Sequence, residues 1–346
     1  MSARLKAPAS REECLAAMAR TSSVELQLQL RKELPPETYY ADIAELYITN
    51  PFFPLTDDEF AYFTRTARQG HASSLLISRE AARRSTTPRY GVFCMPKSGS
   101  SFVTTALQAA LQLRKVSLTG VGREQVHSTL GMNSREQEVD EFALVKAILT
   151  SPAGFVSQTH TRYSMYLGLQ ISQFGVRPLV TVRNILDCIV SFDEMMRKER
   201  RGRRDDGWLV DAQFALPLDF QDRDDTARYD LLARSFGVWL IAFYLSWKRC
   251  ARQSYVRPLW VRYEEDVLNT DRLLRLLSQG LNLRPDQFAR LHDYLADPDR
   301  QRSRFNVGTA GRGRERVPEA AIEFLLSHAR LFSAEISEDE VRYLIR

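Results

Sequence analysis

The chain has 346 residues, of which 44% are hydrophobic and 26% charged, and its formal net charge is +5. This composition is typical of a soluble globular protein, and the small positive surplus does not predict nucleic-acid binding. The length allows one large core with an appended segment. The longest apolar stretch, 236–247, is too short to span a bilayer, so no transmembrane segment is expected.

The cysteines and the N-terminus bear on the cellular compartment. The four cysteines have no spacing that suits a zinc site or a disulfide framework. The first twenty residues are charged and lack the apolar core of a signal peptide. Both features favour a cytoplasmic location.

Residues 1–88 have a mostly helical pattern and are expected to form an N-terminal extension packed on the core. Within it, Thr56 is expected to cap a helix that opens with acidic residues. Downstream, apolar runs alternate with segments of helical period. Strands are expected at 91–95, within 113–123, and at 155–158, 178–182 and 259–263. Helices are expected at 102–113, 137–149, 185–198, 235–252, 273–281, 318–329 and 338–345.

Strands separated by helices imply βαβ units and therefore a parallel sheet with covered faces. Residues 89–346 are thus predicted to form one α/β domain, a doubly wound parallel sheet of the P-loop NTPase type. The polar span 199–230, rich in Arg and Asp, is interpreted as an insertion or lid beside the substrate mouth.

The loop after the first of these strands has the features of a phosphate cradle. Strand, tight loop and helix present backbone N–H groups and a positive helix end to an anion. Lys97 adds a full charge, and the neighbouring serines add hydroxyl groups. It is not a Walker A loop, because Lys97 precedes Gly99 instead of following the second glycine. On its own the segment could equally be a Ser/Gly turn at a helix start.

The sequence Pro-Lys-Ser-Gly-Ser-Ser-Phe at 96–102 resembles the 5′-phosphosulfate loop of sulfotransferases that use 3′-phosphoadenosine 5′-phosphosulfate (PAPS). The usual form in that family is Pro-Lys-Ser-Gly-Thr-Thr-Trp. The resemblance implies that Lys97 also stabilises the charge that builds on the bridging oxygen. It further implies that the aromatic residue lies near the adenine. The cofactor-binding residues implied here are Lys97, Ser98, Gly99, Ser100, Ser101 and Phe102.

The segment 182–192 resembles the 3′-phosphate motif of the same family, in which an arginine ends a strand and a serine follows two helical turns later. Arg183 and Ser191 keep the spacing of eight residues. A guanidinium offers a planar fork of donors to phosphate, and a serine adds one short hydrogen bond. The alternative is that Arg183 only caps the sheet edge or pairs with Asp187.

Gln158-Thr159-His160 lies between these motifs, where cytosolic members of the family have Lys-Thr-His. The resemblance implies that His160 is the general base, since a neutral imidazole can accept a proton near neutral pH. Gln158 replaces the lysine, so one cationic contact to the sulfuryl group or its leaving oxygen is missing or comes from another residue. Without the resemblance, a lone histidine after a strand is more often a packed or hydrogen-bonded structural residue. Other branches of the family use Glu as the base, so Glu194 is the alternative.

Two further segments resemble parts of the nucleotide site. Tyr263, in Val-Arg-Tyr-Glu-Glu-Asp, corresponds to a tyrosine on the adenine side of the family's site, or else is a core residue at a strand end. The segment 305–314 resembles the glycine-containing loop that closes over the nucleotide, with an anion nest of backbone N–H groups. Its arginine–lysine pair is replaced by Asn-Val, so Arg304, Arg312 or Arg314 must supply the charge. The implied residues are Gly308, Thr309, Ala310 and Arg312.

The sequence therefore predicts a PAPS-dependent sulfotransferase without a metal ion, acting on a small-molecule, carbohydrate or lipid-linked acceptor. One rival is a Mg²⁺-dependent nucleotide or small-molecule kinase on a related fold, and another is a non-catalytic nucleotide-binding module. The sequence does not identify the acceptor or the role of residues 1–88, and a homo-oligomer stays open.

Overall fold

The computed structural model describes residues 10–20, 24–49, 55–119, 139–202, 216–217, 219–250, 256–297 and 310–346. They fall into two compact units, divided between Ser78 and Arg79. Among these residues, no helix has the length and apolar character needed to cross a membrane.

The N-terminal unit is helical, as predicted. Helices α1 (Arg11–Arg20), α2 (Val24–Arg31), α3 (Tyr39–Thr49) and the first part of α4 (Asp57–Arg84) surround a small apolar core. Thr56 caps α4 as expected, because its hydroxyl accepts the N–H of Glu59 and the Glu59 carboxylate accepts the N–H of Thr56 at 2.7 Å. The buried guanidinium of Arg31 pairs with Glu59 at 2.8 Å. These bonds fix where α4 begins.

The second unit is built on a five-stranded sheet. Its strands are β1 (Arg89–Cys94), β2 (Arg114–Val116), β3 (Phe155–Thr159), β4 (Arg177–Val182) and β5 (Leu259–Arg262). They lie in the order β2-β3-β1-β4-β5, and every neighbouring pair is parallel. The predicted α/β class and parallel sheet are confirmed.

Helices connect these strands and continue beyond the last one. Between β1 and β5 the chain forms α5 (Ser100–Leu111), α6 (Glu141–Thr150), α7 (Met165–Gln173), α8 (Ile185–Gly202), η1 (Phe220–Asp222), α10 (Asp225–Leu232), η2 (Ala233–Gly237) and α11 (Val238–Cys250). After β5 it forms η3 (Tyr263–Val267), α12 (Thr270–Leu281), α13 (Pro285–Ala296), α15 (Arg312–Arg316), α16 (Glu319–Arg330) and α17 (Glu338–Ile345).

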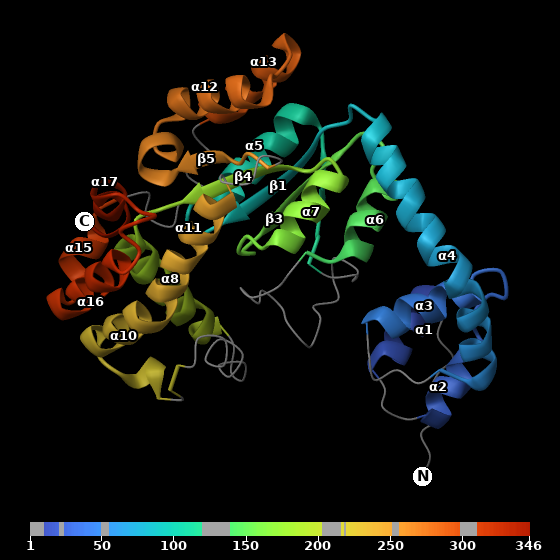
Figure 1. The fold of residues 1–346 in the computed structure, drawn as a ribbon. Coiled ribbons are helices and arrows are strands. Elements are labelled where there is room, and N and C mark those ends of the chain that lie inside the picture. The colour runs from blue at the N-terminus through green and yellow to red at the C-terminus, as the bar shows by residue number, and fades with distance from the viewer. Residues whose placement is uncertain are drawn as a thin grey trace. The chain divides into compact units, whose positions relative to one another are not determined.

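Helices cover both faces of the sheet. Val92 and Cys94 of β1 belong to an apolar cluster that includes residues of α5, α12 and α13. Phe93 points to the other face, where its ring centroid lies 4.6 Å from that of Trp247 on α11. Figure 1 shows α12 and α13 on one side of the sheet, and α6 and α7 on the other. With both faces covered, the carboxyl ends of the strands are where a ligand is expected in such a sheet.

The span 199–230 is described only in part, since residues 203–215 and 218 lie outside the described ranges. Its last part carries core side chains: Phe220 and Tyr229 are buried. Arg228 pairs with Asp193 of α8 at 2.8 Å, and both side chains are buried. This end of the span is therefore packed structure that continues the core beneath α8.

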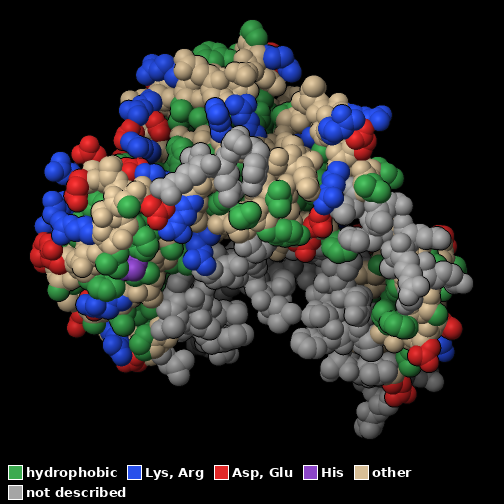
Figure 2. All heavy atoms as spheres, in the orientation of Figure 1, with side chains coloured by type: hydrophobic (Ala, Val, Ile, Leu, Met, Phe, Trp, Pro, Cys, Tyr) green, Lys and Arg blue, Asp and Glu red, His purple; other side chains and the backbone are tan. Residues whose placement is uncertain are grey.

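Side chains of both signs are interspersed on the face in Figure 2, over the region of α10, α15 and α16. Arg234 pairs with Asp230 at 2.9 Å, and Arg314 pairs with Glu319 at 2.7 Å. Many basic side chains of this region are thus neutralised by carboxylates of the same chain.

Candidate nucleotide-binding site

The loop between β1 and α5 turns through two left-handed residues. Lys97 has φ of 69° and Gly99 has φ of 74°, and α5 begins at Ser100. A Cβ atom on Gly99 would lie 2.9 Å from Val267 and 3.0 Å from the ring of Tyr263, so only glycine fits. The first N–H groups of α5 have no acceptor within the helix. The loop therefore has the shape of an anion cradle at the carboxyl end of β1.

Several predicted cradle residues hold the loop in place. The Ser98 hydroxyl donates to the carbonyl of Met95 at 2.6 Å and lies 2.6 Å from the Thr181 hydroxyl, so its single proton is used within the protein. The Gln158 amide donates to the Ser100 hydroxyl at 2.9 Å. Ser101 is exposed. Phe102 is only 2% exposed and packs in the core near Tyr294, so its ring has little surface to offer an adenine.

Arg183 links three of the predicted motifs. It follows β4, is buried, and donates from Nη1 to the carbonyl of Lys97 at 2.9 Å. Its guanidinium lies 4.1 Å from the ring centroid of Tyr263, which follows β5. Burial raises the pKa of Tyr263, so the phenol stays neutral beneath the guanidinium. The ends of β1, β4 and β5 thus meet around one cation.

Arg183 also lies close to Asp187, the pairing that the sequence left as an alternative to phosphate binding. Its Nη2 lies 3.6 Å from the carboxylate of Asp187, which is itself buried. That distance is long for a hydrogen-bonded pair. Asp187 directs both carboxylate oxygens elsewhere, since they accept the N–H groups of Gly311 at 2.8 Å and Gly313 at 2.7 Å. Asp187 therefore joins the arginine to the start of α15.

The face of α8 that carries Ser191 is the one on which α15 docks. Ser191 is buried, four residues after Asp187 and three before Glu194, so the three side chains share one helix face. Glu194 accepts both Nη groups of Arg312, at 2.8 and 3.1 Å, and Nη1 of Arg316 at 2.7 Å. Burial alone would raise the pKa of Glu194, but these hydrogen bonds outweigh it and lower that pKa. A carboxylate held in this way is a poor general base.

The predicted closing loop is described only at its end. Gly308 and Thr309, with Arg304, lie outside the described residues. Ala310 is exposed, and Gly311 has φ of 88°. The buried Nε of Arg312 has no hydrogen-bond partner in the part of the chain that the structure describes. Arg312 therefore keeps one unpaired donor close to α8, whereas Arg314 is engaged by Glu319.

His160 follows β3 and is held by β1. Its Nδ1 lies 2.8 Å from the carbonyl of Cys94, which can only accept a hydrogen bond, so Nδ1 carries the proton. In the neutral ring Nε2 then has the lone pair. The next residues are fixed as well, because Trp247 donates to the carbonyl of Thr161 at 3.2 Å. The imidazole is therefore held at the carboxyl ends of β1 and β3.

Sequence reasoning missed the residues that hold these elements together. Asn184 caps α8 through hydrogen bonds from Leu186 and Asp187, and its own N–H donates to Glu264 at 2.9 Å. Tyr343 of α17 donates to Glu264 at 2.6 Å. Burial raises the pKa of Glu264 in spite of these bonds. A signal was present, since Asn184 stands where a strand ends and a helix begins.

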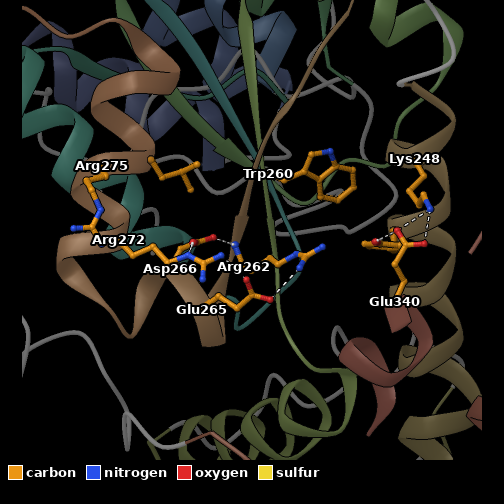
Figure 3. A pocket seen from close by; sticks show the side chains of 10 residues that line it. Lys248, Trp260, Arg262, Glu265, Asp266, Arg272, Arg275 and Glu340 are labelled. Carbon is orange, nitrogen blue, oxygen red and sulfur yellow. Dashed lines mark hydrogen bonds and ion pairs between the residues drawn. The ribbon is translucent and has the colours of Figure 1, made fainter. Parts of the chain in front are cut away.

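A cavity of about 570 Å³ lies apart from these residues, on the side of the edge strand β5 (Figure 3). None of the residues predicted to bind nucleotide or to catalyse lines it. Within the described ranges, no group of three or more His, Cys, Asp or Glu side chains is arranged to hold a metal ion. The candidate site is therefore defined by the loop, Arg183 and His160, and not by this cavity.

Comparison with known proteins gives little beyond this geometry. No family model matches the chain, and no curated protein matches it. Among solved structures, it is similar to the crystal structure of mouse sulfotransferase SULT7A1 complexed with PAP. The two share 15% sequence identity with a TM-score of 0.47, and the match covers 78% of this chain and 91% of that one. A likeness of this size assigns no ligand or reaction to the chain.

Proposed function

We propose that the protein is a PAPS-dependent sulfotransferase that moves the sulfuryl group to a hydroxyl or amine of a small-molecule, glycan or lipid-linked acceptor. The observation that carries this proposal is the position of Arg183. It touches the carbonyl of Lys97 at 2.9 Å and the ring of Tyr263 at 4.1 Å, so motifs that resemble one family's nucleotide site converge in space. If Arg183 only stabilised the fold, the chain would not need the tight turn at Gly99 beside it.

The residues present fit a nucleotide with two phosphate-like ends. Gly99 leaves space in the loop that a Cβ would fill, and α5 directs its positive end to that space. Lys97 would hold the phosphosulfate and stabilise charge on the departing oxygen. Arg183, Ser191 and Arg312, whose Nε has no partner among the described residues, would hold the 3′-phosphate. Ser98 and Phe102 would support the loop from within.

The donor supplies a sulfuryl group attached to a phosphate that can leave. His160 would accept the proton of the acceptor hydroxyl at Nε2 while a new oxygen–sulfur bond forms and the sulfur–oxygen bond to the phosphate breaks. Adenosine 3′,5′-bisphosphate then leaves with the electron pair. We prefer His160 to Glu194 as the base, because two arginines hold Glu194 as a carboxylate with a lowered pKa.

We place the enzyme in the cytoplasm. All four cysteines are buried free thiols, which suits a reducing compartment. Residues 1–88 are proposed to serve as an extension of the catalytic domain 89–346.

The test is calorimetric titration of the whole chain with adenosine 3′,5′-bisphosphate, beside ATP with Mg²⁺. We expect binding of the bisphosphate alone and a loss of about tenfold or more in Arg183→Lys, which keeps the charge but not the planar fork. A thermal melt of Arg183→Lys checks that the variant is folded. Binding of ATP with Mg²⁺ instead would favour the kinase, and binding of neither would favour the non-catalytic module.

A further inference from the structure

A second candidate site lies on the outer side of β5. The cavity of about 570 Å³ has the size of a small-molecule site and receives side chains from α11, β5, η3, α12 and α17. Its position does not depend on the nucleotide site, because Tyr263 faces Gly99 while its neighbours Arg262 and Glu265 line the cavity. It therefore needs an explanation of its own.

The charged groups in the cavity are mostly neutralised by one another. Glu265 accepts Arg262 at 2.9 Å and Arg272 at 2.5 Å, and Arg272 also reaches Asp266 at 2.7 Å. On the opposite wall Lys248 pairs with Glu340 at 2.6 Å (Figure 3). The carboxylates are therefore already occupied by cations, so the cavity does not attract a further positive ligand.

Arg275 is the exception among these groups. It lies on α12, one helical turn after Arg272, and its side chain is exposed at the side of the cavity (Figure 3). Within the described part of the chain its guanidinium has no ion-pair partner. The lining holds four basic and three acidic side chains, so it carries one surplus positive charge. Arg275 supplies that surplus and has its donors available for an anion.

An aromatic surface completes the cavity. Trp260, on β5, is half-buried, and its ring centroid lies 5.3 Å from that of Tyr244 on α11. Such rings offer a surface on which a planar ligand can stack. The sheet edge itself is not available for an added strand at this point, because the N–H of Arg262 already donates to Asp266 at 2.7 Å. A small molecule therefore fits better here than an extended peptide.

From the cavity, the unpaired Arg275 and the ring of Trp260, we propose that this is a binding site for a small aromatic anion. The ring of the ligand packs on Trp260, and its carboxylate, sulfonate or phosphate group accepts hydrogen bonds from Arg275. The proposal goes beyond the transfer reaction and does not require it.

The test uses naphthalene-2-sulfonate as the probe and naphthalene-2-sulfonamide as its uncharged counterpart, titrated calorimetrically into the whole chain. The sulfonate should bind with one-to-one stoichiometry, and both Arg275→Ala and the change to the sulfonamide should weaken binding about tenfold or more. The matched control is Arg330→Ala, because Arg330 is also an exposed helical arginine, at the end of α16. It should leave the affinity unchanged.

A second readout locates the ring of the probe. The probe should quench tryptophan fluorescence, and Trp260→Phe should remove that quenching while calorimetry still detects binding. Affinity for the sulfonate that is equal in Arg275→Ala and wild type would overturn the proposal, and so would no binding at millimolar concentration. Neither result would affect the bisphosphate titration, so the two proposals can fail separately.

Discussion

The carboxylate of Asp187 accepts the backbone N–H of Gly313 at 2.7 Å, and this bond ties the start of α15 to the first turn of α8. The two backbones lie so close that a Cβ on Gly313 would overlap the backbone of Leu186. Asp187 accepts a second N–H from Gly311, so one buried side chain holds the whole turn. The turn carries Arg312 to the side of α8 on which Ser191 lies.

We expect Asp187→Asn to destabilise this junction. An asparagine amide has one acceptor oxygen and turns N–H donors toward the second backbone N–H, which leaves a buried donor unsatisfied. The free energy of unfolding in urea should fall by about 2–3 kcal/mol, since two hydrogen bonds to a charged group are altered. Hydrogen exchange at Gly311 and Gly313 should become faster than in wild type.

Asp293→Asn is the control for this change, because that side chain is 81% exposed on α13. Its effect on unfolding should stay within about 0.5 kcal/mol. Equal effects of the two substitutions would mean that the Asp187 bonds do not hold the junction.

Gly99→Ala and Gly70→Ala should change stability in opposite directions. Gly99 has φ of 74° and a neighbouring tyrosine ring, so alanine there costs about 1–2 kcal/mol for the backbone and more for the overlap. Gly70 lies within α4, and a Cβ added there would meet no atom within 4 Å, so alanine should stabilise by about 0.5–1 kcal/mol. Thermal melts of the two variants compare them, and two shifts of the same sign would contradict the account.

Glu340 should make stability depend on acid pH. Burial opposes its ionisation, but hydrogen bonds from Lys248, Tyr244 and Ser337 lower its pKa from 4.5 to about 2. Because the folded state prefers the carboxylate, its contribution is complete above pH 4.5 and is lost as the pH falls toward about 2. Urea unfolding at several pH values should show Glu340→Gln less stable than wild type at pH 7. The difference should shrink in acid, and a constant difference would contradict this assignment.

The sequence predicts β1 and β4 most clearly, because each contains an apolar run that is followed by helical periodicity. The short strand β2, Arg-Lys-Val, has no such run, so the sequence places it only within 113–123. It also predicts which loops meet, since parallel strands end at one edge. It does not predict what Ser98 and Phe102 do, because only the fold shows that Thr181 and Tyr294 lie beside them. The sequence also does not show whether Arg183 binds a ligand or pairs with Asp187. A separation of four residues permits either contact.

His160 gives the prediction that depends most directly on the proposed reaction. Its Nδ1–H donates to the carbonyl of Cys94 at 2.8 Å, which leaves Nε2 as the basic nitrogen. An asparagine can keep the bond to that carbonyl but cannot accept the acceptor's proton. His160→Asn should therefore lower the transfer rate by about 10²–10⁴-fold. The affinity for adenosine 3′,5′-bisphosphate, measured by calorimetry, should stay within about twofold of wild type, because general-base catalysis contributes to the rate and not to nucleotide binding.

The pH dependence separates a base from a structural histidine. With His160 as the base, the wild-type rate should fall as the pH drops through the range in which an imidazole is protonated, and His160→Asn should lack that fall. Glu194→Gln is the comparison, because Glu194 is the other candidate base and is already held by Arg312 and Arg316. It should keep the wild-type pH profile. If the fall of the rate in acid is lost in Glu194→Gln and kept in His160→Asn, Glu194 is the base instead.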